Sequence, residues 1–184
     1  MWTALQKDGG PDEVAIILVP YRTAIAALDE SAAMIERQLA HQVRQLTLWA
    51  AWAKGVRGLA ELSFAGLIGE AGRSPGEYRS VSALWKRFGL AVLDGERQRR
   101  VKDADQALLQ GYAPQRRAFA YVVSTNLMRS QRAGDPFRQV YDHRKAYELA
   151  REIPKGHAHN RALRVMVKEL LKRAWVADRA ERAA

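Results

Sequence analysis

Apolar side chains recur at alternating spacings of three and four residues between residues 18 and 53. The seam they form consists of Leu18, Tyr21, Ile25, Leu28, Ala32, Ile35, Leu39, Gln42, Leu46, Trp49 and Ala53, in which Gln42 is the one polar member. This spacing puts every member on one stripe of an α-helix, so it predicts a helix over residues 13–54 whose seam, about 50 Å long, packs lengthwise on another helix. The partner is either a later helix of the same chain or a second copy. We favour a homodimer formed through Leu18, Tyr21, Ile25, Leu28, Ile35, Leu39, Leu46 and Trp49.

The segment in front of this helix contains residues that break regular structure. Gly9, Gly10 and Pro11 interrupt it, so we predict a flexible leader over residues 1–12. Residues 14–19 are apolar and rich in β-branched side chains, a pattern typical of a strand, but Pro20 ends the run and no partner strand is evident. We therefore expect one or two helical turns there, bent at Pro20.

A glycine-containing turn follows the long helix. Gly55 and Gly58 supply backbone freedom for the turn, and residues 62–68 restart a helix that Gly69 and Gly72 end. The unpaired amides at the start of the new helix favour a phosphate, and the residues that would contact it are Arg57, Gly58, Leu59, Ala60 and Glu61. An equally weighted alternative is that the glycines only let two helices cross closely.

The rest of the chain reads as further helices over residues 77–88, 111–128, 136–152 and 160–176. In the last of these, Leu163, Val167, Leu170, Leu171 and Trp175 face inward, and Arg161, Arg164, Lys168, Lys172 and Arg173 face outward. Residues 177–184 are expected to fray. With no repeat and no strand pattern, the prediction is an all-α fold: a helical arm, then a helix-hairpin-helix-containing domain over residues 55–176.

The charge of the chain is strongly positive. It carries 30 Lys and Arg residues against 20 Asp and Glu residues, which gives a formal net charge of +10 and a pI near 10.2. Such an excess predicts a polyanionic partner, most commonly nucleic acid. Residues 86–132 hold ten of the basic residues and four acids, which favours a concentrated binding face over a uniform solubilising coat. The candidate residues on this face are Lys86, Arg87, Arg97, Arg99, Arg100, Lys102, Arg116 and Arg117.

Several classes of protein are disfavoured by composition. The chain has no cysteine, which excludes disulfides, thiolate metal sites and cysteine nucleophiles. We interpret His157 and His159 as solvated histidines of a loop and predict no metal site and no cofactor. No apolar run approaches the length of a membrane-spanning helix and no signal-peptide pattern opens the chain, so we expect no membrane partner and a cytoplasmic location.

Four segments, taken in order, carry a family resemblance. They are RGLAELSFAGLIGEAG (57–72), YRSVSALWKRFGL (78–90), GYAPQRRAF (111–119) and HNRALRVMVKELLKRAW (159–175). Their order and spacing resemble the C-terminal domain of the Piv/MooV-like insertion-sequence transposases. Those enzymes connect their two halves by a long coiled-coil arm, which the heptad helix matches. The resemblance covers roughly residues 18–176 and implies DNA binding through a helix-hairpin-helix.

The chain also departs from that family. The family's RNase-H-like domain, whose four acidic residues hold magnesium, has no counterpart in this sequence. The nucleophilic serine expected shortly after Leu90 is replaced by the neighbourhood of Gln98 and Arg99, and Ser124 and Ser130 belong to another segment. Ala60 also stands where the family's hairpin has its second glycine. We therefore do not expect an enzyme.

Three hypotheses follow for function. The first is a non-catalytic DNA-binding protein related to the transposase C-terminal domain. The second is one subunit of a split transposase or recombinase that works with a separate catalytic subunit or an RNA. The third is a helical adaptor whose arm binds a protein and whose charge only keeps it soluble. We give the first the greatest weight.

Overall fold

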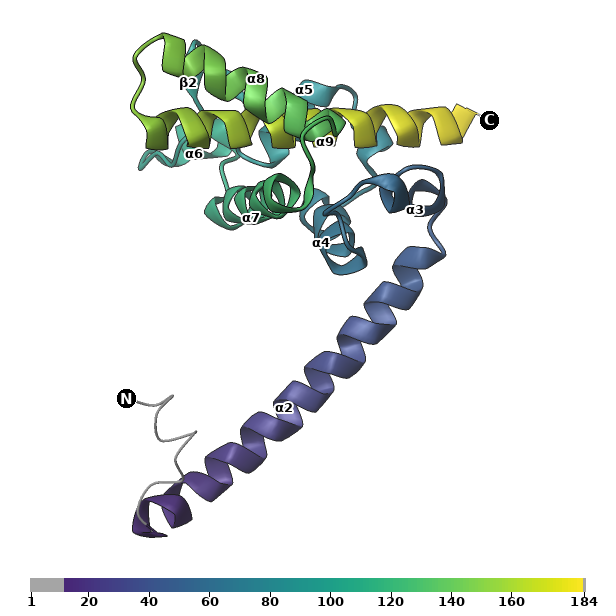
Figure 1. Ribbon diagram of the computed structural model, residues 1–184, viewed down its shortest axis with the longest axis vertical. Helices are drawn as coiled ribbons and strands as arrows, with labels where there is room; N and C mark the ends of the chain where they lie inside the picture. Colours follow the sequence, from purple (N-terminus) through teal and green to yellow (C-terminus); the bar gives the residue numbers. More distant parts are fainter. Residues whose placement is uncertain (1–11, 184) are drawn as a thin grey trace. The chain divides into compact units, whose positions relative to one another are not determined.

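The computed structural model describes the backbone of residues 12–183 and the side chains of residues 18–183 (Figure 1). Of the leader predicted over residues 1–12, residues 1–11 lie outside the described residues, and Asp12 is the first residue of a helix. Helices dominate the part of the chain that is described, with one two-stranded sheet, so the all-α prediction is confirmed. The chain divides into two compact units, Met1–His41 and Gln42–Ala184.

Helix α2 (Asp12–Arg44) accounts for the described part of the first unit and reaches three residues into the second. It contains the apolar run of residues 14–19 and also Pro20, so this run is helical, as expected, and not a strand. Most of the predicted seam on this helix is exposed: 60% of Tyr21, 69% of Leu28 and 51% of Ile35 is accessible, while Leu18 is buried.

The long helix is shorter than predicted, because α2 ends at Arg44 and does not continue to residue 54. The amides of Gln45 and Leu46 donate to carbonyls three residues back, and Leu46 is extended before the short helix α3 (Thr47–Ala51) and a 3-10 turn, η1 (Ala53–Gly55). The physical reason is core formation, since the break lets Trp49 enter the interior, with its ring centroid 5.5 Å from that of Phe64. Trp49 is therefore a core residue, and its assignment to the exposed dimer seam was wrong.

The core of the second unit is one hydrophobic cluster shared by several helices. These are α3, α4 (Glu61–Ala71), α5 (Val81–Arg87), α7 (Pro114–Ser130), α8 (Pro136–Ala150) and α9 (Lys155–Ala183). Helix α9 lies along α8 and also contacts α7, α3 and α5 (Figure 1). Its apolar stripe is fully buried, and so are Phe64 and Leu84. The predicted inward face of α9 is confirmed at Leu163, Val167, Leu170 and Leu171.

The structure contains a β-hairpin that the sequence analysis did not predict. Strands β1 (Val92–Leu93) and β2 (Glu96–Arg97) pair antiparallel, with Val92 opposite Arg97. Asp94 and Gly95, the two turn residues, have φ of 51° and 78°. A two-residue Asp-Gly loop with both φ positive is the tight turn that suits two short strands, and this dipeptide was the available signal. A short helix, α6 (Ala104–Gln110), follows and was also not predicted.

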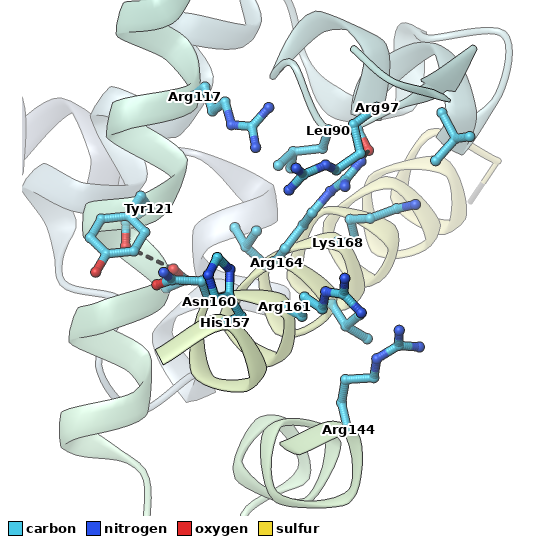
Figure 2. Close-up of a pocket in the computed structure, with 14 residues that line it drawn as sticks. Leu90, Arg97, Arg117, Tyr121, Arg144, His157, Asn160, Arg161, Arg164 and Lys168 are labelled. Atoms are coloured by element: carbon cyan, nitrogen blue, oxygen red, sulfur yellow. Dashed lines mark hydrogen bonds between the residues drawn. The ribbon is translucent and has the colours of Figure 1, made fainter. Parts of the chain in front are cut away.

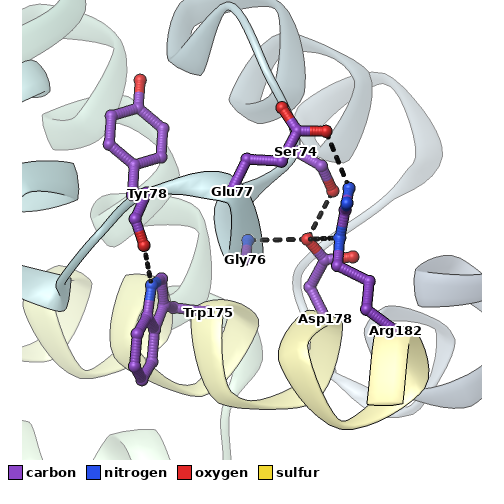
Figure 3. A network of polar contacts seen from close by, with 7 residues as sticks. All are labelled: Ser74, Gly76, Glu77, Tyr78, Trp175, Asp178 and Arg182. Carbon is purple, nitrogen blue, oxygen red and sulfur yellow. Dashed lines mark hydrogen bonds and ion pairs between the residues drawn. The ribbon is translucent and has the colours of Figure 1, made fainter. Parts of the chain in front are cut away.

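Helix α9 is longer than predicted at both ends. It begins at Lys155, so His157 and His159 are helical and not in a loop. It also continues to Ala183, so the tail expected to fray from residue 177 is helical because its side chains have partners. The carboxylate of Asp178 accepts hydrogen bonds from the Ser74 hydroxyl at 2.5 Å and the Gly76 amide at 2.6 Å (Figure 3).

The segment that α9 holds in this way is the 3-10 turn η2 (Pro75–Glu77). Arg182 donates to Asp178 at 3.3 Å and to Glu77 at 2.9 Å, and the Trp175 indole N–H donates to the Tyr78 carbonyl at 2.9 Å (Figure 3). The helix predicted over residues 77–88 is accordingly only α5, which starts at Val81 with Ser80 as its N-cap.

Candidate functional site

A basic pocket of about 890 Å³ lies between α7, α8, α9 and the β-hairpin (Figure 2). Six cationic side chains line it: Arg97, Arg117, Arg144, Arg161, Arg164 and Lys168. No carboxylate is among its lining residues. Like charges gathered in a concave site produce a strongly positive local potential, so the pocket suits an anion.

Helix α9 supplies the floor of this pocket. His157, Arg161, Arg164 and Lys168 follow one another at spacings of four, three and four residues, which aligns them on one stripe of the helix. The prediction that these cations simply face outward is wrong for Arg164 and Lys168, which are partly buried beside the core stripe. The sequence signal was a basic stripe directly next to the apolar one.

Arg164 is the most strongly perturbed cation of the site. Its Nη2 donates to the carbonyls of Leu90 at 2.8 Å and Ala91 at 3.0 Å, while its buried Nε has no hydrogen-bond partner. Burial, and then the neighbouring charges of Arg117 and Arg97, lower the pKa of Arg164 to about 10. It remains protonated at neutral pH, and the repulsion marks a site short of negative charge.

Two further cations complete this part of the pocket. Lys168 has its pKa lowered by burial and then by Arg164, and its Nζ lies 3.8 Å from the centre of the Trp85 ring. Arg117 reaches from α7 and donates to the carbonyls of Gly89 at 3.4 Å and Gln98 at 3.2 Å. Neither has an ion pair with any carboxylate of the described residues.

The other side of the pocket is held by a buried carboxylate on α8. Glu148 is fully buried and forms ion pairs with Arg144 and with Arg161, the latter at 2.7 Å. Burial on its own raises the pKa of Glu148, but the hydrogen bonds from Arg161 and Arg144 outweigh it and lower the pKa below its ordinary value. Glu148 therefore stays ionised and fixes the two arginines at the pocket wall.

Gln98 is one of the two residues near which the predicted family resemblance would place a serine. It is fully buried, accepts a hydrogen bond from the Ala91 amide at 3.3 Å, and donates to the carbonyls of Lys86 at 3.0 Å and Gln110 at 2.5 Å. Its side chain thus ties the β-hairpin to two neighbouring segments. This is an anchoring role, and it holds in place the loop carbonyls that position Arg117 and Arg164.

The predicted hairpin residues lie elsewhere, at the end of α7. Gly58 has φ of +90°, and a Cβ at this position would come within 2.8 Å of Ser130 Cβ. Arg57 forms an ion pair with Asp135 at 3.8 Å, Leu59 is buried, and Ala60 is the N-cap of α4. Gly58 thus has the close-packing role that was the alternative interpretation of this turn.

The first turn of α4 already has an acidic side chain of its own. A hydrogen bond from its own backbone N–H, followed by one from Arg44 at 3.0 Å, holds the pKa of Glu61 below its ordinary value. A phosphate at this turn would have to approach beside that carboxylate. The turn at residues 57–61 is therefore electrostatically less favourable for a phosphate than the pocket is.

The remaining predicted cations fall into two groups. Arg87 donates to the Glu70 carbonyl at 3.0 Å, and Arg116 pairs with the Glu70 carboxylate at 3.6 Å, so both side chains are engaged at the C-terminal end of α4. Lys86, the residue before Arg87, is half-buried. Arg99, Arg100 and Lys102 are exposed, and Arg99 pairs with Glu96 at 3.1 Å. Of the predicted site residues, the structure brings only Arg97 and Arg117 into the pocket.

The described residues show neither a metal-binding cluster nor a membrane-spanning helix. Among residues 12–183, no group of three or more histidines and carboxylates is arranged to hold a metal ion. His159 is engaged otherwise, with Nδ1 2.6 Å from the Tyr141 hydroxyl. Within the same range, no helix is long and apolar enough to cross a membrane.

Comparisons with known proteins were made at three levels. No family model, no curated protein and no solved structure gives a significant match to this chain. The resemblance to the transposase C-terminal domain therefore stays a prediction.

Proposed function

We propose that this chain is a non-catalytic nucleic-acid-binding protein of the cytoplasm, with DNA its preferred partner, that contacts phosphate groups through the basic pocket. The observation that carries the proposal is the convergence of Arg97, Arg117, Arg164 and Lys168 without a carboxylate partner. Charges paired within the chain contribute little to binding a polyanion, whereas unpaired ones release counterions from it.

The exposed basic run next to the pocket extends the proposed contact surface. Arg99, Arg100 and Lys102 follow Arg97 directly after strand β2. Contacts of this kind neutralise the phosphate backbone and carry little sequence information, so we expect weak sequence preference. Residues 57–61, in the turn before α4, remain a second and weaker candidate for contacting phosphate.

The test is fluorescence anisotropy with a random duplex, a four-way junction and a structured RNA at about 50 and about 200 mM salt. Four phosphate contacts should weaken the affinity about a hundredfold over this interval. The double variant Arg97→Gln, Lys168→Gln should flatten the slope of log affinity against log salt by about two. The matched control, Arg79→Gln with Arg151→Gln, removes two exposed charges outside the pocket. Equal slopes for the two double variants would show that the pocket does not contact the nucleic acid.

The exposed seam of α2 supports a second part of the proposal, a homodimer. Its central apolar residues are accessible, with Leu28 69% and Leu39 45% exposed, and such an apolar stripe favours pairing with another helix. Leu28→Glu should shift a dimer to monomer in sedimentation equilibrium, whereas Ala27→Glu, one position off the seam, should not. A wild-type chain that is monomeric at high concentration would refute the homodimer.

A partner of a different kind on the same seam would favour the split-recombinase or adaptor alternatives. In the split-recombinase case, a separate catalytic subunit or an RNA would bind and the preferred ligand would be the junction or the structured RNA. In the adaptor case, no nucleic acid would bind at either salt concentration. The same titrations therefore separate all three hypotheses.

A further inference from the structure

The pocket differs in shape from a surface that follows a nucleic-acid backbone. Figure 2 shows Arg117 from α7, Arg97 from β2, and Arg164 and Lys168 from α9 converging from different elements on one space. Along a strand, by contrast, the phosphate groups are spread out and each carries a single charge. Convergent cations therefore suit one compact anion of high charge.

The two central arginines are positioned before any ligand arrives. Arg164 is held by the carbonyls of Leu90 and Ala91, and Arg117 by those of Gly89 and Gln98. The buried Gln98 side chain anchors the segments that carry these carbonyls. Preorganised donors lose little conformational freedom on binding, so they contribute more of their interaction energy to affinity.

The repulsion among the pocket cations indicates how much negative charge a well-suited anion carries. Arg117 and Arg97 are close enough to Arg164 to lower its pKa, and Arg164 lowers that of Lys168 in turn. One singly charged diester would leave much of this repulsion uncompensated. A terminal phosphate monoester carries nearly two negative charges at neutral pH and three strong acceptor oxygens.

The pocket also has room and contacts for more than the phosphate. Its volume of about 890 Å³ extends to a wall where Tyr121, His157 and Asn160 lie together, apart from Arg97 and Lys168 (Figure 2). Tyr121 is 50% exposed, and an accessible aromatic ring is a stacking surface for a base. An amide and an imidazole beside it offer hydrogen bonds.

From these observations we infer that the pocket binds a terminal nucleotide through its phosphate monoester, with the base against Tyr121. The shared chemistry is that of a phosphorylated strand end or of a free mononucleotide. The inference deepens the proposed function and rests on it only for the strand end as the source of this group.

The experiment compares short single strands that differ only at their ends: 5′-phosphate, 3′-phosphate and hydroxyl at both ends, with a fluorophore at an internal base. At about 150 mM salt, at least one phosphorylated strand should bind about fivefold or more tightly than the hydroxyl strand, because charge-assisted hydrogen bonds to arginine are strong and geometrically specific. Adenosine monophosphate should compete for that difference. Equal affinities for all three strands would overturn the inference while leaving nucleic-acid binding intact.

Variants locate the effect in the pocket. Arg97→Gln with Lys168→Gln should abolish the preference, and neither side chain makes a hydrogen bond in the described structure that the fold would lose. Tyr121→Ala should weaken binding of the mononucleotide more than binding of inorganic phosphate. Arg79→Gln should keep the preference, because it removes a charge outside the pocket. If the preference survives the double pocket variant, the assignment is wrong.

The source of the phosphate is decided by the same titrations. A protein that binds adenosine monophosphate by calorimetry but none of the strands would retain the pocket and refute the proposed function. A protein that binds neither the mononucleotide nor a phosphorylated end preferentially would refute the pocket assignment.

Discussion

The two halves of helix α9 use their charges in opposite ways. Of the pocket cations in residues 157–168, only Arg161 pairs with a carboxylate, and that carboxylate is Glu148 of α8, which also pairs with Arg144. In residues 169–182 two of the three carboxylates pair with cations of the same helix: Glu169 with Arg173 at 2.9 Å and Asp178 with Arg182 at 3.3 Å. The same helix in the same basic chain thus has a charge-balanced half that stabilises the fold and an unbalanced half available to a ligand.

A net charge of +10 does not by itself locate a binding site on this chain. The total charge alone describes attraction to polyanions and says nothing of where they bind. The position of a site follows from which cations lack carboxylate partners after folding, and in the pocket those cations come from three different elements, β2, α7 and α9. Charge density along the sequence cannot show this, because partners are acquired across the fold.

The largest expected effect comes from removing Glu148 of α8, the one carboxylate that pairs with a cation of the unbalanced half. Glu148→Gln leaves Arg144 and Arg161 beside a buried neutral group, and breaking a buried charge pair on one side is strongly destabilising. We expect Tm, followed by circular dichroism at pH 7, to fall by about 10 °C. Asp142→Asn on the same helix, which breaks an exposed pair with Arg138, should change Tm by about 2 °C or less. Equal shifts would show that Glu148 is not central.

In the balanced half, Asp178→Ala should have the next largest effect. It removes the acceptor of the Ser74 hydroxyl and of the Gly76 amide, so two polar groups lose their partner (Figure 3). The free energy of unfolding should fall by about 2 kcal/mol and Tm by about 5 °C. Asp178→Asn, which keeps an acceptor oxygen, should lose less. Nucleotide binding should not change in either variant, and a weakened affinity would show that the two halves of α9 are coupled.

Acid should reveal the ionisation of Glu148. The pKa of this carboxyl is lower in the folded chain than its ordinary value of 4.5, so its contribution to stability is complete above pH 4.5 and is lost as the pH falls through the folded value. The wild type should therefore lose Tm below pH 4.5 more steeply than Glu148→Gln. Glu61, whose pKa is also lowered, is present in both proteins and so cancels in the comparison. Parallel pH profiles would contradict the assignment.

How far the sequence predicts this molecule depends on the range of the interactions. The helices from α4 to α9 follow local periodicity, glycine stops such as Gly72 with φ of 77°, and N-caps such as Ser80, so most were predicted within a few residues. The end of α2 at Arg44 could not be predicted from the sequence, because the heptad pattern continues to Ala53. Only packing against the core of the second unit interrupts the helix.

The site was predictable only in part for the same reason. Arg97 and Arg117 were found because they lie in dense basic runs. Arg164 and Lys168 were predicted to be ordinary outward charges, since the groups they contact, the carbonyls of Leu90 and Ala91 and the Trp85 ring, are distant in sequence. Glu148 shows no sequence signal as a buried carboxylate, because its burial results from α8 lying along α9.

The smallest expected effects are two changes in Tm that should have opposite signs. Arg97→Gln removes a cation that has no partner in the described structure and that repels Arg164, so Tm in phosphate-free buffer at low salt should rise by about 1 °C. Arg173→Gln removes a cation that pairs with Glu169 and lies 5.0 Å from the centre of the Phe137 ring, so Tm should fall by about 2 °C.

Both shifts should shrink in about 1 M sodium chloride, where the Debye length is about 3 Å. The rise for Arg97→Gln should shrink most, because it is purely electrostatic, while Arg173→Gln keeps its loss of packing on Phe137. Differential scanning fluorimetry of the two variants beside the wild type measures the signs directly. If both substitutions lower Tm by the same amount, the two halves of α9 do not differ in charge balance, and the cations of the pocket are as well compensated as the rest.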